Sequence, residues 1–183
     1  MEKTGQRGFT LLELLTTIAV LAVVLGIAVP SMRSGAEKRR AIAAAEEIYS
    51  EIQLARSEAI SRSQPIYMNI AEGADWAIGI SNDAACDPSD NDPACALPDV
   101  TNSNPITHRF TFADHSDVSI ATSTGQITFQ SQRGTATSAT IDVTSTGDIG
   151  YVMSVVVGPL GQISICSSDA DPGKHVPGYD PCS

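Results

Sequence analysis

One acidic side chain lies inside a long apolar stretch near the start of the chain. Glu13 is the only charged residue between Phe9 and Val29, a run of 21 residues. A helix rises about 1.5 Å per residue, so this run would be about 31 Å long, enough to cross the roughly 30 Å core of a bilayer. A charged group costs roughly 2.5–3.5 kcal/mol at the centre of such a helix and less toward an end. Glu13 is therefore a candidate functional group that needs a partner.

The residues before this stretch suggest how the chain is processed. Lys3 and Arg7 give a short polar leader its positive charge. A secretory signal has its small-residue cleavage site after the apolar stretch, whereas Gly8 comes before it. Cleavage after Gly8 would leave the apolar helix on the mature protein and free an α-amino group at Phe9. That amine would lie about one helical turn from Glu13, so the carboxylate could face an amine of its own chain or of a neighbour.

The run Gly8-Phe9-Thr10-Leu11-Leu12-Glu13 resembles the prepilin peptidase site of type IV pilins and type II secretion pseudopilins. The resemblance implies that the peptidase cleaves between Gly8 and Phe9 and that Phe9 is N-methylated. It also implies that Glu13 pairs with the N-terminal amine of an adjacent subunit in a helical filament. Two charges that are each costly in lipid would then neutralise one another. The alternative is an ordinary membrane anchor with a tolerated polar residue.

Helical periodicity extends well beyond the apolar stretch. Pro30 removes a helical hydrogen bond and Gly26 weakens the helix before it, so we expect a kink or local melting over residues 26–30. The pattern then resumes and ends near Ser63, before Pro65. Its apolar positions recur every three or four residues and form one narrow stripe. The stripe consists of Ala41, Ala45, Ile48, Ile52, Ala55 and Ala59.

Short β-prone runs separated by Gly, Pro, Asn and Asp follow Pro65. The expected strands are Ile66–Ile70, Trp76–Ser81, Thr107–Phe112, Val118–Ala121, Gln126–Gln130, Thr140–Thr144, Tyr151–Val157 and Gln162–Cys166. The segment 83–104 is rich in Pro, Asp and Asn and is predicted to be a surface loop.

These elements predict an α+β fold in four segments. Residues 1–8 are a leader, 9–29 a transmembrane or filament-core helix, 30–63 its amphipathic continuation, and 64–183 a β domain. The fold class is pilin-like: a long kinked N-terminal helix, with a transmembrane first half, packed on a C-terminal antiparallel β domain of one or two sheets.

Four cysteines follow the apolar stretch: Cys86, Cys95, Cys166 and Cys182. An even number beyond a membrane span is typical of disulfides in an oxidising compartment. Three pairings are open, and we favour the two local ones, 86 with 95 and 166 with 182. A zinc site is the alternative, but the sequence has no C-x-x-C pair and its three histidines are scattered.

The charge distribution bears on partners and on topology. The chain has a net charge of −10, and from Ser63 onward three basic residues face fourteen acidic ones. Such a surface repels phosphate, so we do not expect nucleic acid as a partner. Two basic residues precede the span and four follow it closely (Arg33, Lys38, Arg39 and Arg40), so the positive-inside rule would place the C-terminal side in the cytoplasm. The cysteines and the resemblance instead favour a cytoplasmic leader, a single inner-membrane span and a periplasmic C-terminal domain, which becomes part of the pilus after assembly.

Two other clusters contain residue types that can do chemistry. Asp114-His115-Ser116-Asp117 has the residue types of a catalytic triad, but alternate residues of an extended segment point in opposite directions. The acidic runs 87–92 and 169–173 carry possible calcium ligands, but neither has the EF-hand spacing with its final Glu. No phosphate-binding glycine loop is present. We expect no enzyme activity, no cofactor and no metal.

Later motifs narrow the resemblance. The helix end 52–60, the strand Ile127-Thr128-Phe129 and the pair Arg133-Gly134 resemble the GspH/FimT/FimU family of minor pilins and pseudopilins. The resemblance implies a minor type IV pilin that primes or caps pilus assembly, with pilus-linked motility or adhesion as its outcome. Its partners would be other minor and major pilins, bound through the N-terminal helix. The alternatives are a minor pseudopilin of type II secretion and a DNA-uptake pilin. Some DNA-uptake members carry a Gly-Arg-x-Arg element where this chain has Gly161-Gln162-Ile163-Ser164.

Overall fold

A computed structural model describes residues 9–73, 75–90, 92–98, 106–168 and 173–182. The chain divides into two compact units, residues 1–36 and 37–183. One helix, α1 (Leu11–Arg62), contributes to both units. Gly8, the predicted cleavage residue, lies outside the described residues.

The first unit is the N-terminal part of α1. Thr10 caps the helix, because its hydroxyl accepts a hydrogen bond from the Glu13 amide at 3.2 Å. Phe9, just before this cap, is 85% exposed, and the large apolar side chains from Leu11 to Ile27 are exposed as well. A window of 18 residues here has a mean hydropathy of 2.5 and no buried residue. By length and composition, α1 is the one helix in the described part of the chain that can cross a membrane.

The helix continues without interruption through Gly26 and Pro30. Local melting, one of the two outcomes expected from the sequence, is therefore not observed. Pro30 has no N–H to donate to the Gly26 carbonyl, and a long helix survives the loss of one such bond. A bend of the helix axis at these residues stays a prediction.

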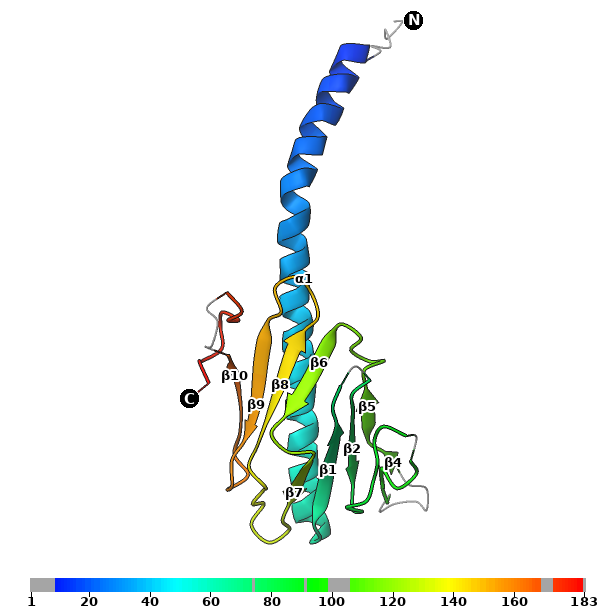
Figure 1. Ribbon diagram of the computed structural model, residues 1–183, viewed down its shortest axis with the longest axis vertical. Helices are drawn as coiled ribbons and strands as arrows, with labels where there is room; N and C mark the ends of the chain where they lie inside the picture. Colours follow the sequence, from blue (N-terminus) through cyan, green and yellow to red (C-terminus); the bar gives the residue numbers. More distant parts are fainter. Residues whose placement is uncertain (1–8, 74, 91, 99–105, 169–172, 183) are drawn as a thin grey trace, which may run out of the picture. The chain divides into compact units, whose positions relative to one another are not determined.

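The second unit combines the C-terminal part of α1 with two four-stranded antiparallel sheets (Figure 1). The first sheet has the order β5-β2-β1-β7 and the second β10-β9-β8-β6, while β3 and β4 form a separate pair. The strands are β1 (Ile66–Ala71), β2 (Ala77–Ser81), β3 (Ala96–Leu97), β4 (Ile106–Thr107), β5 (Arg109–Thr111), β6 (Val118–Thr122), β7 (Gln126–Phe129), β8 (Ala139–Ser145), β9 (Val152–Val157) and β10 (Ile163–Ser167).

The core lies between α1 and the two sheets. All six stripe residues predicted from the sequence are fully buried, and Ala44 is buried with them. They share one apolar cluster with strand residues such as Met68, Ile127 and Val155. The Trp76 indole joins the sheets at one point, because it donates to the Val118 carbonyl at 2.9 Å. The α+β fold predicted from the sequence is confirmed.

Two strand predictions need correction. The segment 107–112 was expected to be one strand, but it divides at His108 into β4 and β5. β4 pairs with β3 and β5 pairs with β2, so the chain changes sheet at this residue. β3 itself lies inside the predicted surface loop. Its two residues are buried, which the polar composition around them conceals.

Ser63 ends α1. Its φ of 55° places it in the left-handed region, and its amide donates to the Ile60 carbonyl at 3.3 Å. Pro65 then prevents the helix from resuming. The last turn of α1 is also held by Arg62, which pairs with Glu58 and donates to the Pro98 carbonyl at 2.5 Å.

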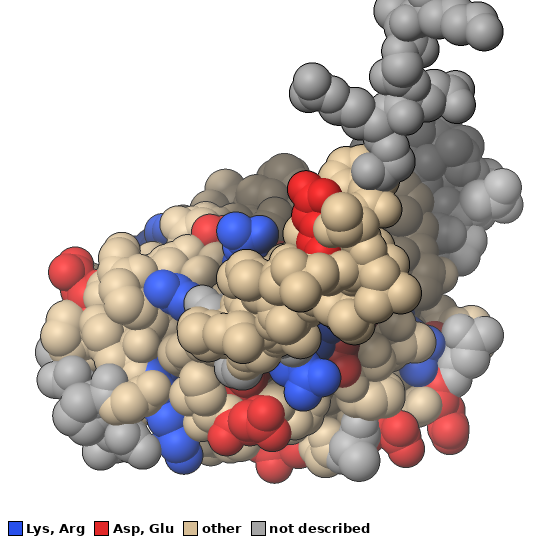
Figure 2. All heavy atoms as spheres, turned by 90° about the horizontal axis from the view of Figure 1, so that it is seen from above, with Lys and Arg blue, Asp and Glu red and all other residues tan. Residues whose placement is uncertain are grey.

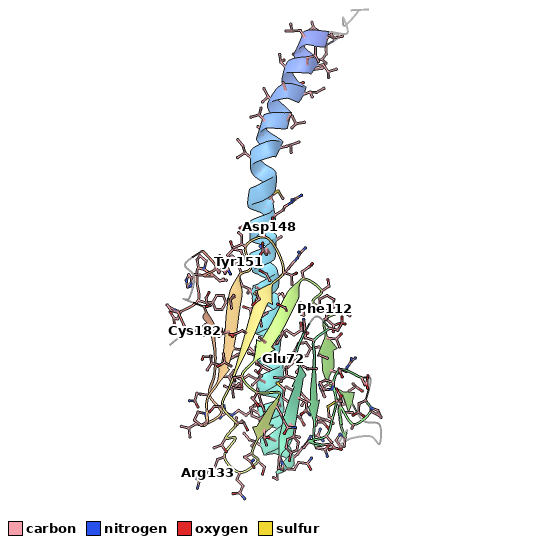
Figure 3. The ribbon with its side chains drawn as sticks, viewed as in Figure 1. Glu72, Phe112, Arg133, Asp148, Tyr151 and Cys182 are labelled. Carbon is pink, nitrogen blue, oxygen red and sulfur yellow. A yellow bond between two sulfur atoms is a disulfide. The ribbon has the colours of Figure 1, made fainter. Side chains whose placement is uncertain are left out.

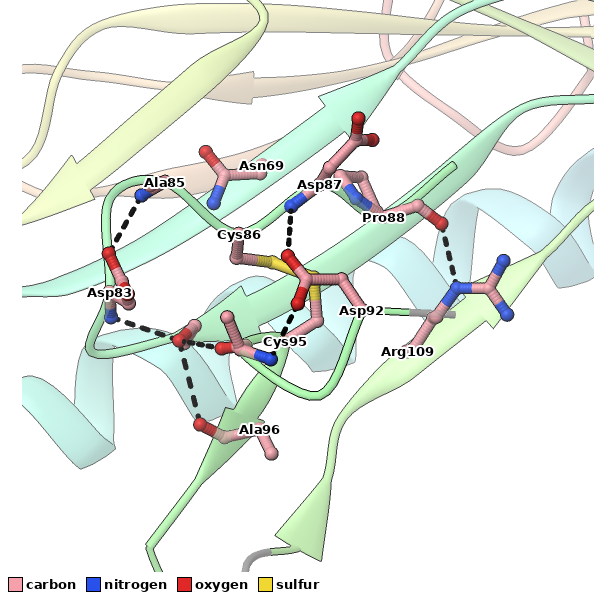
Figure 4. Close-up of a disulfide and its surroundings, with 12 residues drawn as sticks. Asn69, Asp83, Ala85, Cys86, Asp87, Pro88, Asp92, Cys95, Ala96 and Arg109 are labelled. Carbon is pink, nitrogen blue, oxygen red and sulfur yellow. Dashed lines mark hydrogen bonds between the residues drawn. A yellow bond between two sulfur atoms is a disulfide. The ribbon is translucent and has the colours of Figure 1, made fainter. Parts of the chain in front are cut away.

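Both disulfides are the local ones favoured from the sequence: Cys86–Cys95 and Cys166–Cys182. The first closes a loop over β2 (Figure 4). A Cβ added at Gly79 of β2 would lie 3.1 Å from the Cys86 sulfur and 3.2 Å from the Cys95 sulfur. The loop therefore lies flat on the strand because residue 79 has no side chain.

We expect Gly79→Ala to destabilise the protein by about 1–3 kcal/mol, because an added methyl group meets both sulfur atoms and the Pro88 ring. Urea unfolding of the detergent-solubilised chain measures this change. Gly125→Ala is the matched control, since a Cβ there would have an ordinary contact of 3.7 Å with the Ile70 carbonyl. Equal stability of the two variants would contradict the close packing of the loop on β2.

Candidate functional site

The first candidate site is the start of α1. Thr16 and Thr17 satisfy their hydroxyls within the helix, by donating to the carbonyls of Glu13 and Leu14 at 3.0 and 2.8 Å. The Glu13 carboxylate has no partner among the described residues, and it is exposed on an apolar helix. A polar group of this kind in lipid is unfavourable until another group pairs with it.

Backbone geometry adds to this site. Thr10 and Glu13 have the T-x-x-E spacing of a capping box, and the Leu14 amide bonds the Thr10 carbonyl at 3.2 Å. The carboxylate therefore belongs to the first turn, where the helix dipole favours negative charge. Sequence inspection missed this cap, although the spacing is readable. The arrangement can form an ion pair with an amine.

A second acidic side chain on α1 has a structural role that the sequence analysis missed. Glu37 is 7% exposed and accepts hydrogen bonds from the Ser145 hydroxyl at 2.9 Å and from the amides of Ile149 and Gly150 at 3.2 and 2.7 Å. It thereby fixes the β8–β9 loop to the helix. A Cβ at Gly147 would lie 2.3 Å from its carboxyl carbon. The sequence carries one signal for this role: Glu37 precedes Ala41 of the stripe by four positions and therefore lies on the same face of the helix.

The triad-like run 114–117 does not assemble into a triad. His115 Nε2 lies 2.5 Å from the Glu47 carboxylate, and the imidazole stacks on Trp76 with centroids 6.5 Å apart. Asp114 instead accepts from the Thr111 amide at 2.8 Å, and Asp117 pairs with Arg40 at 3.1 Å. These contacts attach the loop before β6 to the helix.

Two further acidic side chains lie on the same part of α1, Glu51 and Glu46. Burial raises the pKa of Glu51, with Glu47 acting in the same direction and His108 against it. On another face, the Tyr179 hydroxyl donates to Glu46 at 2.8 Å. Burial, followed by this hydrogen bond, raises the pKa of that phenol. The helix thus binds the C-terminal segment as well as the sheets.

Carboxylate oxygens of the first acidic run, and of Asp83 before it, accept hydrogen bonds within their own loop (Figure 4). Asp83 accepts from the Ala85 amide at 2.9 Å, and Asp92 accepts from the amides of Asp87 and Ala94 at 3.2 and 2.9 Å. Hydrogen bonds from Ser89 lower the pKa of Asp87. No group of three potential metal ligands occurs in the described residues. Most of the second run, 169–172, lies outside them.

Charges on the surface are mixed. Figure 2 shows acidic and basic side chains scattered singly among neutral ones on the face seen from above. Figure 3 shows Arg133 at the opposite end of the second unit, where α1 ends.

Comparison with known families decides the identity of the chain. Residues 44–161, more than half of its length, match the family model of the type II transport protein GspH. The chain belongs to the GspH family. Residues 3–29 match the prokaryotic N-terminal methylation motif, which includes the run from Gly8 to Glu13. The resemblance recognised in the sequence is therefore confirmed.

Solved structures share the fold of this GspH-family chain. The type IV minor pilin FimU of Pseudomonas aeruginosa is similar with a TM-score of 0.52 and 19% identity, over 78% of this chain and 96% of that one. The minor pseudopilin EpsH of the Vibrio cholerae type 2 secretion system has a TM-score of 0.48 and 14% identity, over 70% and 97%. No curated protein sequence matches the chain significantly.

Membership fixes the general role. As a member of the GspH family, the chain is a minor pilin or pseudopilin, a class of structural subunits that assemble with other pilins. The apolar helix and the methylation motif are those of a chain that is anchored in a membrane before it assembles.

Glu37→Gln should destabilise the second unit by about 1–3 kcal/mol, because the carboxylate oxygen Oε1 that accepts all three hydrogen bonds becomes a neutral and weaker acceptor, or is replaced by an NH2 group that cannot accept them. Thermal unfolding of the detergent-solubilised chain measures the loss. The exposed Asp75 provides the control Asp75→Asn, which should change stability by less than about 0.5 kcal/mol. A Glu37→Gln variant as stable as this control would contradict the role of the carboxylate in fixing the β8–β9 loop.

Proposed function

We propose that this protein is a minor type IV pilin that primes or caps pilus assembly. The observation that carries the proposal is the Glu13 carboxylate, which lies within the methylation motif on an exposed apolar helix and has no partner among the described residues. Before assembly the leader lies in the cytoplasm, α1 crosses the inner membrane once, and the second unit lies in the periplasm. After assembly the chain is part of the pilus.

Processing creates the partner that the carboxylate lacks. Prepilin peptidase cleaves between Gly8 and Phe9, and the new Phe9 amine is methylated but keeps its positive charge. Glu13 of one subunit binds the N-terminal amine of a neighbour. Each charge alone is costly in lipid, whereas the pair is much less so, and this difference favours the assembled state over the free subunit.

The second unit supplies lateral surfaces for other minor and major pilins. Its two disulfides fix the loop over β2 and the C-terminal segment, as suits a domain displayed outside the cell. Disulfides form in the periplasm as well as outside the cell, so they agree with a pilin and with a pseudopilin. The description of the family model, a type II transport protein, favours a second candidate, a minor pseudopilin of protein secretion. We do not extend the proposal to DNA uptake, because the acidic composition after Ser63 opposes phosphate binding.

Mass spectrometry of the mature protein should find N-methylphenylalanine at residue 9 as the first residue. The expectation follows from the match of residues 3–29 to the methylation motif. Gly8→Val serves as the control, since a branched side chain next to the cleaved bond should leave the leader attached. A mature wild-type chain that still begins at Met1 would contradict the processing proposal.

Glu13→Gln should reduce incorporation into filaments about tenfold or more, because a loss of only about 1.4 kcal/mol per contact lowers an equilibrium tenfold. A deletion strain complemented with each variant is scored for surface pili and for export of secreted enzymes. Thr17→Ala is the matched control, since that hydroxyl bonds only its own helix. Loss of pili with export intact supports the pilin, and loss of export with pili intact moves the protein to the secretion system.

A further inference from the structure

Two turns meet at the end of the second unit where α1 ends. The Ala136 amide, in the β7–β8 loop, donates to the Pro159 carbonyl of the β9–β10 turn at 3.2 Å. Gly134 and Gly161 both have positive φ, 60° and 74°. A Cβ on Gly161 would lie only 2.0 Å from the Gly134 carbonyl oxygen, so this approach requires glycine. The surface built by the two turns is therefore preformed.

The side chain of Arg56 lies under this contact. Its Nε would be 3.1 Å from a Cβ at Gly134 and 3.0 Å from one at Gly161. That nitrogen is buried and has no hydrogen-bond acceptor in the described part of the chain. Buried N–H groups are normally paired, so this guanidinium lacks a compensating acceptor at Nε. Arg56 as a whole is only half-buried, so another molecule can approach the rest of its guanidinium group.

A second arginine follows the same turn. Arg133 directly precedes Gly134, is exposed, and stands at this end of the unit (Figure 3). Arg62 and Arg109 both have acceptors in the structure. Arg56 and Arg133 have none within the described ranges, although fourteen acidic residues follow Ser63. Both cations lie at the turn around Gly134, so an anion bound at this turn would be attracted by both.

Apolar and polar groups surround the arginines. Ile60 and Leu160 are 49% and 71% exposed. The Ile60 side chain would be 3.0 Å from a Cβ at Gly134, and Leu160 directly precedes Gly161, so both belong to the same surface. A groove of about 430 Å³ adjoins them and is lined by Gln130, Ser131, Gln132, Arg133 and Thr135. Arginines and apolar side chains with a polar rim are typical of protein interfaces.

We propose that this end patch (Arg56, Ile60, Arg133 and Leu160) docks an acidic segment of a neighbouring subunit in the same filament. A carboxylate of that segment binds the two arginines, and an apolar side chain next to it packs on Ile60 and Leu160. A polyanion is a poorer fit, because the acidic remainder of the unit repels repeated phosphates. The inference rests on the proposed function, which makes the chain a filament subunit.

The test is photo-crosslinking of the full-length chain in its native host. A photoreactive benzoylphenylalanine replaces Leu160, and the exposed Ala121 on β6 receives the same probe as the matched control. We expect the probe at residue 160 to join an Asp- or Glu-rich peptide of another chain that carries an N-terminal methylation motif. Arg133→Glu should lower the yield about tenfold by reversing the charge, while Arg133→Lys should keep most of it.

Several results would overturn the docking proposal. The first is a crosslinking yield at residue 160 no higher than at residue 121. The second is crosslinking of residue 160 to a nucleic acid, a polysaccharide or a non-acidic peptide. The third is an unchanged crosslinking yield in Arg133→Glu. Methylation of Phe9 and incorporation into filaments are measured in the same cells. If both persist while the crosslink is absent, the end patch proposal fails and the proposed function stands. An unprocessed Phe9 would overturn the proposed function itself, and the docking proposal with it.

Discussion

Burial of one narrow stripe on α1 is the constraint on which the second unit depends. The stripe is built mainly from alanines, which let two sheets approach the helix backbone, with Ile48 and Ile52 filling the space between them. A larger side chain at an alanine position would push a sheet away and open the core on both sides. Every other contact of the helix, from Glu37 at one end of the stripe to Arg56 at the other, is positioned by this packing.

The same helix works in two different solvents. From Leu11 to Ile27 its large apolar side chains are exposed, whereas from Ala41 to Ala59 its fully buried apolar side chains form one stripe. A helix that is apolar all round is stable in lipid, and one with a single apolar stripe is stable against a sheet in water. The acidic side chains of the two parts of the helix also differ in their partners. Glu13 lacks a partner among the described residues, whereas Glu37 receives its hydrogen bonds from its own chain. The partner proposed for Glu13 is another molecule, whereas Glu37 completes the fold of its own chain.

Most of the fold could be predicted from the sequence, because its signals are periodic or local. Spacing and turn residues predict the stripe, the succession of the main strands along the chain, and the end of α1 beside Pro65. The division at His108 could not be predicted, because alternation along 107–112 says nothing about which strand pairs with each half. Glu37 and Arg56 were missed for a related reason. The residues that surround them in space are more than 75 positions away in the chain, and only the folded structure brings them together.

The C-terminal segment determines when the second unit can finish folding. Val176 is fully buried, Tyr179 bonds a helix residue 133 positions earlier, and Cys182 is joined to β10. A chain that lacks this segment would therefore have an open core beside β10. Contacts of such long range require a large loop to close. In the proposed topology, the apolar helix holds the domain at the membrane before this segment arrives, so anchoring precedes the completion of folding.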